Sequence, residues 1–189
     1  LRSKMGPVMI QLPASFCGKN IQQLEKFIRQ LSMEYSYAVE LRHGDFFHGD
    51  TESRVIDILN KYRIDKVNFD SRALFSSTSE DNFTLEAKNK KPQLPVNLLA
   101  TGSYPIIRFI GHEVLSENDK YFDQCSQAIN SWMEQGKQPF LFAHLANNAQ
   151  AYLLAKHLHQ HVKLKNPALK DLPSWPAERE SESGQIGLF

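Results

Sequence analysis

The residues IDKVNFD (64–70) form the third of five short runs rich in β-branched or aromatic residues, and these runs decide the fold. The other four are PVMIQL (7–12), YAVELR (37–42), PIIRFI (105–110) and PFLFAH (139–144). Each run is nearly continuous in apolar character, which is typical of parallel strands that are covered on both faces. The runs therefore predict five strands of one parallel sheet.

Helical patterns separate most of these runs. Apolar residues recur at helical spacing over residues 21–31, 55–62 and 121–133, and a last helix is predicted over 149–161. The segment 71–104 differs, because it is long and is interrupted by Pro92 and Pro95. It predicts a loop with one short helix near 80–89. Alternating strands and helices indicate an α/β fold with right-handed crossovers and a parallel sheet, either open or closed.

Composition limits the class of protein. The 189 residues are 41% hydrophobic, which is enough for one core, and we expect a domain over 1–165 with an extended Pro-rich and charged tail over 166–189. Lysine and arginine total 22 against 21 acidic residues, so no global field favours nucleic acid or a membrane. No stretch approaches the roughly 18 apolar residues that span a bilayer. Cys17 and Cys125 lack metal or disulfide spacing, which favours packing roles in a reducing cytoplasm.

Polar side chains gather where the predicted strands end. They are Gln11, Glu40 with Arg42, Asn68 with Asp70, Arg108, and His144. In parallel α/β folds the functional groups lie at the carboxyl ends of the strands. We therefore expect a pocket in which Arg42 and Arg108 bind a small anion and Glu40 or Asp70 acts as general acid or base. The alternative is a set of internal ion pairs that only fixes the strand register.

Two histidine patterns raise the question of a metal. The loop HGDFFHGD (43–50) offers four possible ligands, but its spacing matches no known site, and Asp50 is equally suited to cap a helix. His157 and His161 are four residues apart on the last predicted helix, where imidazoles also favour the negative end of the helix dipole. We prefer the dipole role, and the sequence predicts neither a metal nor a cofactor.

The runs GPVMIQLPASF, YAVELRH, VNFDSR and PIIRFIG, in this order, resemble the YecE-like family, a bacterial family of unknown function. The segment KKPQLPV and the final LF resemble its enterobacterial branch. The resemblance implies a TIM-barrel-like (β/α) barrel in which the five strands correspond to strands four to eight. On this expectation the first three β-α units are absent and the chain is a C-terminal portion.

The family pattern matches this chain at Gln11, Leu12, Pro13, Glu40, Arg42, His43, Asp70, Arg108 and Gly111. The resemblance thus adds His43 and Gly111 to Gln11, Arg42 and Arg108 as candidate substrate-binding residues. The chain departs from the pattern at Ile110, where much of the family has histidine. Asn147 and Asn148 match a family Asn-Asn-Asp segment only loosely.

The last five residues, QIGLF (185–189), are similar to the short peptide with which bacterial proteins dock on the DNA sliding clamp. Leu188 and Phe189 would fill a hydrophobic groove with Ile186, while Gln185 would supply hydrogen bonds. The leading hypothesis is an enzyme that acts on a small or phosphorylated anion at the strand ends. The alternatives are a clamp-associated accessory protein in DNA metabolism and an interaction scaffold.

Overall fold

The computed structural model describes residues 5–175 and contains one sheet of five parallel strands. The strands are β1 (Val8–Gln11), β2 (Tyr37–Glu40), β3 (Asp65–Asp70), β4 (Ile106–Ile110) and β5 (Phe140–His144). The α-helices are α1 (Ile21–Ile28), α2 (Gly49–Tyr62), α3 (Arg72–Ser76), α4 (Asn82–Lys90), α5 (Asp119–Glu134) and α6 (Ala151–Lys165). All five predicted strands are confirmed.

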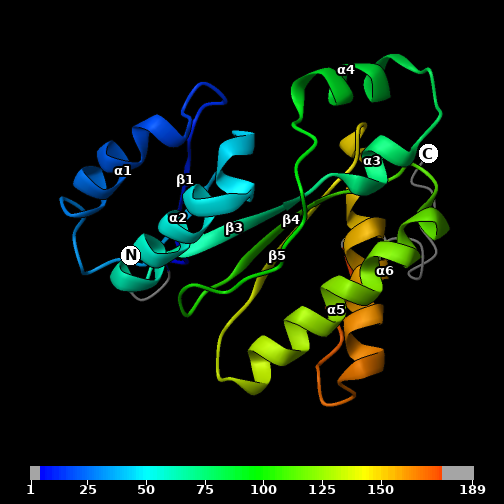
Figure 1. Cartoon of the computed structure of the whole chain (residues 1–189). Helices are drawn as coiled ribbons and strands as arrows, with labels where there is room; N and C mark the ends of the chain where they lie inside the picture. The colour runs from blue at the N-terminus through cyan, green and yellow to red at the C-terminus, as the bar shows by residue number, and fades with distance from the viewer. Residues whose placement is uncertain (1–4, 176–189) are drawn as a thin grey trace, which may run out of the picture.

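The strands lie side by side in the same order as in the sequence, β1-β2-β3-β4-β5. Right-handed crossovers in such an order bring every connecting helix to the same face of the sheet. Figure 1 shows α1 and α2 beside the first strands and α5 and α6 beside the last, with α3 and α4 near the carboxyl ends. This arrangement is that of a (β/α) barrel wall and differs from a sheet with helices on both faces.

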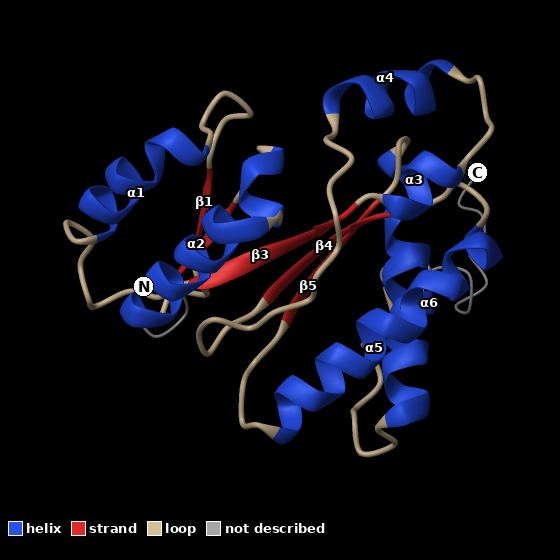
Figure 2. Cartoon of the chain, viewed as in Figure 1, coloured by secondary structure: helices blue, strands red, loops and turns tan. Residues whose placement is uncertain are grey.

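The sheet is curled into a half-barrel, so that its two outermost strands approach each other at one end. A Cβ atom added at Gly6, just before β1, would lie 3.6 Å from the Phe140 ring at the start of β5. Inside the curl, Ala38, Val67 and Ile106 pack together with Phe140. The strands therefore have a concave inner face and a helix-covered outer face (Figure 2).

Two apolar clusters hold the helices on the outer face. Val39 of β2 and Leu41 just after it pack with α1 and α2. Ile107 and Phe109 of β4 pack with α5 and α6. Alternate residues of each strand thus divide between the outer clusters and the inner face, because successive side chains point to opposite sides.

Several element boundaries differ from the sequence prediction. The short helix α4 lies close to the predicted 80–89, but α3 was not predicted and α6 runs on to Lys165. Leu169 of the predicted tail packs against the cluster beneath α5 and α6. The division at residue 165 stays a prediction. Within residues 5–175, no helix is both long and apolar enough to cross a membrane.

Candidate functional site

The polar residues that the structure brings together lie at the carboxyl end of the inner face. Gln11 is the register partner of Glu40, so both side chains point to the same side of the sheet. Arg108 reaches them from β4, across β3. These three residues were predicted as neighbours, and their proximity is confirmed.

Glu40 is the buried centre of this group. Its carboxylate is fully buried and forms an ion pair with the Arg108 guanidinium. The same guanidinium lies 5.6 Å from the centre of the Phe69 ring, a cation–π contact that adds to the ion pair with Glu40. Gln11 Oε1 accepts from Arg108 at 3.3 Å, or, with the amide rotated, Gln11 bridges Glu40 and Arg42.

Arg42 follows the end of β2 and lies between the inner face and the long loop before β4. Its Nη2 donates to the Lys90 carbonyl oxygen at 3.0 Å, and its Nε lies 3.8 Å from Glu40 Oε1. Within the described chain this Nε is buried and has no hydrogen-bond partner. A buried donor without a protein partner is the position that an ordered water or a ligand oxygen normally fills.

Two further residues complete the group, and neither was selected as a site residue from the sequence. Lys91 comes from the loop after α4, and His144 ends β5 on the inner face. Burial lowers the pKa of Lys91, and the nearby charges of Arg108 and Arg42 lower it further. Burial likewise lowers the pKa of His144, with contributions from Arg108 and Lys91. The strand-end position was the signal for His144. For Lys91 the signal was the basic run Lys88, Lys90 and Lys91, which by itself is only weak evidence for a phosphate contact.

We call Gln11, Glu40, Arg42, Lys91, Arg108 and His144 the strand-end cluster. Two cavities adjoin it, and His144 lines both of them. The first, about 320 Å³, lies inside the curl and is lined by Arg108 with apolar side chains that include Met9 and Phe142. The second, about 220 Å³, lies towards α4 and is lined by Lys90 and Lys91. The cluster therefore borders space that a small molecule can enter.

Asp70 does not belong to this cluster, contrary to the expectation of one shared pocket. Its register partner Phe109 packs in the outer core, so the Asp70 side chain faces the helices. The fully buried carboxylate accepts from Arg72 Nε at 3.0 Å and Nη2 at 2.8 Å. Asp70 thus fixes the start of α3 through a bidentate ion pair.

His43 and Gly111 also lie apart from the cluster. His43 Nδ1 accepts from the Asp45 amide at 3.2 Å and caps a short 3₁₀ helix over Gly44–Phe47. A Cβ atom on Gly111 would meet Leu154 Cδ2 at 2.5 Å and Asn118 Oδ1 at 2.9 Å. Glycine is needed here because the helical layer approaches the backbone closely, which is a packing role.

The loop that carries Lys91 is fixed to the sheet at several points. The Asn68 amide donates to the Leu99 carbonyl oxygen and accepts from the Leu99 amide, both at 2.9 Å. Ser71 Oγ donates to the Pro92 carbonyl oxygen at 2.8 Å. Asn68, which the sequence placed among the polar strand-end residues, therefore positions the loop.

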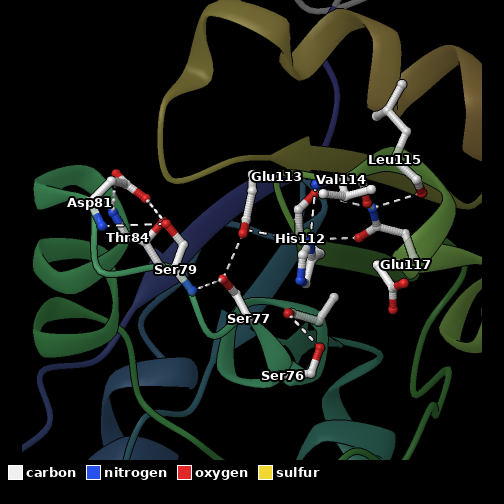
Figure 3. A network of polar contacts seen from close by, with 12 residues as sticks. Ser76, Ser77, Ser79, Asp81, Thr84, His112, Glu113, Val114, Leu115 and Glu117 are labelled. Carbon is white, nitrogen blue, oxygen red and sulfur yellow. Dashed lines mark hydrogen bonds and ion pairs between the residues drawn. The ribbon is translucent and has the colours of Figure 1, made fainter.

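The loops after β3 and β4 are tied to each other by side chains. Figure 3 shows Glu113 pointing towards Ser77, and Ser77 Oγ donates to Glu113 Oε1 at 2.8 Å. The Ser79 amide in turn donates to Ser77 Oγ at 3.1 Å, and the Val114 amide donates to His112 Nδ1 at 3.0 Å. This network holds the rim of the half-barrel beside α3 and α4.

The two histidine patterns have different outcomes. The loop 43–50 takes part in no group of three possible metal ligands within the described residues. His48, and not Asp50, occupies the N-cap position of α2, and its side chain makes no capping hydrogen bond. His157 lies mid-helix in α6 and its Nε2 is 2.6 Å from Asp119 Oδ1, so a dipole contact at the helix end does not describe it. The predicted clamp peptide, residues 185–189, lies outside the described residues.

Fold and site together define a parallel α/β half-barrel protein with a cation-rich cluster at the carboxyl ends of its strands. The chain belongs to the family described as "Protein of unknown function DUF72", whose sequence profile matches residues 1–180. The resemblance seen in the sequence is thereby confirmed at the level of the family.

Known relatives agree with this assignment. The chain is 31% identical over 179 residues to the UPF0759 protein YecE of Escherichia coli K12, a match that covers 94% of this chain and 65% of that protein. A solved DUF72 family protein from Enterococcus faecalis has a TM-score of 0.60 at 13% identity, covering 91% of this chain and 63% of its own. A solved DUF72 family protein from Thermotoga maritima has a TM-score of 0.55 at 19% identity, covering 86% of this chain and 58% of its own. The chain thus spans less than two thirds of these relatives.

Proposed function

We propose that the strand-end cluster binds a small anion, such as a phosphorylated metabolite or a carboxylate, and that the protein acts on this ligand. Arg42, Arg108 and Lys91 bring three cationic groups around the single carboxylate of Glu40. This excess of positive charge beside two cavities favours an anionic ligand. The observation that carries the proposal is the buried Arg42 Nε, which has no hydrogen-bond partner among residues 5–175 and only a long ion pair of 3.8 Å with Glu40.

Within this proposal Glu40 is a positioning residue, because it is fully buried and engaged by Arg108. His144 is the better general base. Its lowered pKa favours the neutral imidazole near pH 7, and a neutral ring nitrogen can accept a proton. A reaction that begins with removal of a proton from a carbon atom beside the phosphate or carboxylate group fits this pairing, because the C–H proton moves to the neutral His144 ring nitrogen and the nearby cations stabilise the negative charge left on the ligand.

Titration calorimetry with inorganic phosphate and with a panel of sugar phosphates and dicarboxylates tests anion binding. Arg42→Gln and Lys91→Gln should each weaken anion binding about tenfold, because each variant lacks one of the cationic groups that surround the bound anion. Lys120→Gln is the matched control, since Lys120 pairs with Glu117 on the outer helical layer. No saturable anion binding, or equal losses in all three variants, would refute the proposal.

Turnover by a His144→Gln variant tests catalysis by His144 separately from anion binding. The His144→Gln variant should retain anion binding but lose turnover of any ligand that the wild-type protein converts. Equal turnover in the variant and the wild-type protein would exclude His144 as the base while leaving anion binding in place.

We further propose that β1 to β5 correspond to strands four to eight of a TIM-like barrel. The consecutive strand order and the single helical face support a barrel. The solved relatives are also longer than this chain. Superposition on the Enterococcus faecalis protein tests the numbering, and alignment of β1 with the first strand of that protein would overturn it.

The second candidate function, docking on the DNA sliding clamp, is favoured by the residues QIGLF (185–189) alone. Deletion of these five residues should abolish binding to a bacterial clamp in surface plasmon resonance, and replacement of Leu188 and Phe189 by alanine should do the same. Unchanged binding, or no binding by the wild-type chain, would remove this function.

A further inference from the structure

We propose that Asp119, His157 and His161 form a binding site for a transition-metal ion, zinc above all, between α5 and α6. Asp119 is the first residue of α5, and the two histidines lie one turn apart on α6. The three side chains come from two helices that pack against each other on the outer layer. The site is separate from the strand-end cluster and from its proposed ligand.

The geometry of the donor atoms supports coordination. Asp119 Oδ1 lies 2.6 Å from His157 Nε2 and 3.4 Å from His161 Nε2, and all three ligand atoms lie within 4.8 Å of one another. Metal–ligand bonds of about 2.1 Å in a tetrahedron place ligand atoms about 3.4 Å apart. One pair already has this separation, and small side-chain rotations bring the others to it.

The surroundings hold the imidazoles in place. The Phe122 ring is fully buried and lies 5.5 Å from the His157 ring and 5.2 Å from the His161 ring, measured between centroids. It packs in turn on Phe109 of β4. The histidines thus rest on a buried apolar ring, while the side chains of Asp119, His157 and His161 are 46%, 30% and 21% exposed, so water has access to the site as a further ligand.

The kind of metal follows from the donor set. Two imidazole nitrogens and one carboxylate oxygen suit zinc and the neighbouring ions cobalt, nickel and copper, whereas calcium and magnesium prefer oxygen-only sites. Histidines at positions i and i+4 of one helix point the same way and can share an ion, as in helical zinc motifs. Three protein ligands and an open position describe a site that can also bind a further small ligand.

Two measurements on the untagged chain test the proposal. One is a zinc titration in a calorimeter, and the other is a cobalt titration in which the visible absorption of bound cobalt is recorded. We expect one equivalent per chain and a melting temperature about 5 °C higher at saturating zinc, because the ion joins two helices. His157→Gln and His161→Gln should each weaken binding at least tenfold. His159→Gln is the matched control, since this residue of the same helix instead contacts the Lys170 carbonyl oxygen at 3.0 Å.

The results separate a metal site from a simple ion pair between Asp119 and the histidines. Absence of saturable zinc binding, or equal losses in His159→Gln and the two cluster variants, would overturn the proposal. If a cluster variant fails to fold, the imidazole nitrogen resonances of the wild-type protein decide. Zinc must then shift the signals of two histidines, and a spectrum unchanged by zinc refutes the site.

Discussion

Replacement of Glu40 by glutamine tests how the strand-end cluster is built, because it removes the only carboxylate and keeps the shape of the side chain. The side chain of Glu40 is fully buried, while those of Arg108 and Arg42 are 12% and 20% exposed. Removing one partner of a fully buried ion pair costs about 3–5 kcal/mol. Because both guanidiniums keep some contact with water, we expect a loss of about 2–3 kcal/mol, or about 5–10 °C in melting temperature.

Anion binding should change in the opposite direction. A carboxylate about 5 Å from a bound anion repels it by about 1–3 kcal/mol at effective dielectric constants between bulk water and a protein surface. The Glu40→Gln variant should therefore bind inorganic phosphate about tenfold more tightly than the wild-type chain. Phosphate should also restore part of the lost melting temperature.

Denaturant unfolding with and without phosphate, together with calorimetry, measures both effects. Glu25→Gln is the control, since this surface carboxyl, whose pKa Arg29 and Lys61 hold at about 2, is remote from the cluster. Weaker phosphate binding by a folded Glu40→Gln variant would refute the repulsion argument. Unchanged stability would show that the ion pair with Arg108 does not hold the cluster together.

Three other predictions concern packing, reactivity and pH. Gly111→Ala should lower the free energy of unfolding by about 2 kcal/mol through overpacking against Leu154, whereas Gly44→Ala, with nothing within 4 Å, should have little effect in the same denaturant titration. A thiol reagent at pH 8 should modify Cys17 quickly and Cys125 only on unfolding, because burial raises the pKa of Cys125 to about 12; two fast thiols would contradict this. Burial lowers the pKa of Lys66, so the unfolded chain holds this proton to higher pH than the folded one, and stability should rise as the pH approaches the ordinary pKa of 10.5. Lys66→Met should flatten that rise and add about 1 kcal/mol to the free energy of unfolding near pH 7. Parallel curves of stability against pH for the two proteins would refute this.

Strand and helix positions could be predicted from the sequence because their signals are local. The apolar runs and the helical stripes need only neighbouring residues to be recognised. The pairing of Glu40 with Arg108 followed from the rule that strand ends carry function, which holds for any parallel order of strands. The strand and helix positions are independent of the register between strands, whereas the meeting of Glu40 and Arg108 on one face depends on it.

The position of Asp70 could not be predicted, because it depends on that register. Two residues that are two positions apart share one face of their strand. This spacing does not show whether that face is the same side of the sheet as the corresponding face of the next strand. The pairing of Ala38 with Asp65 places Val67, two residues on, on the inner face, and Asp70 three residues further on the opposite face. Lys91 is visible in the sequence as part of a basic run, but its place in the cluster was not predicted, because only the folded loop brings it near Arg108 and Arg42.

The loop between β3 and β4 has a consequence for how this family can diversify. It delivers Lys91 to a cluster otherwise built from residues in the strands or, for Arg42, just after one, and it is anchored by Asn68 and Ser71, which do not line that cluster. If the cluster binds the proposed anion, insertions or exchanges in this connection would alter ligand preference without disturbing the ladder of hydrogen bonds between strands. On that proposal, homologues with the same barrel but different lengths of this connection are expected to differ in the ligand they bind.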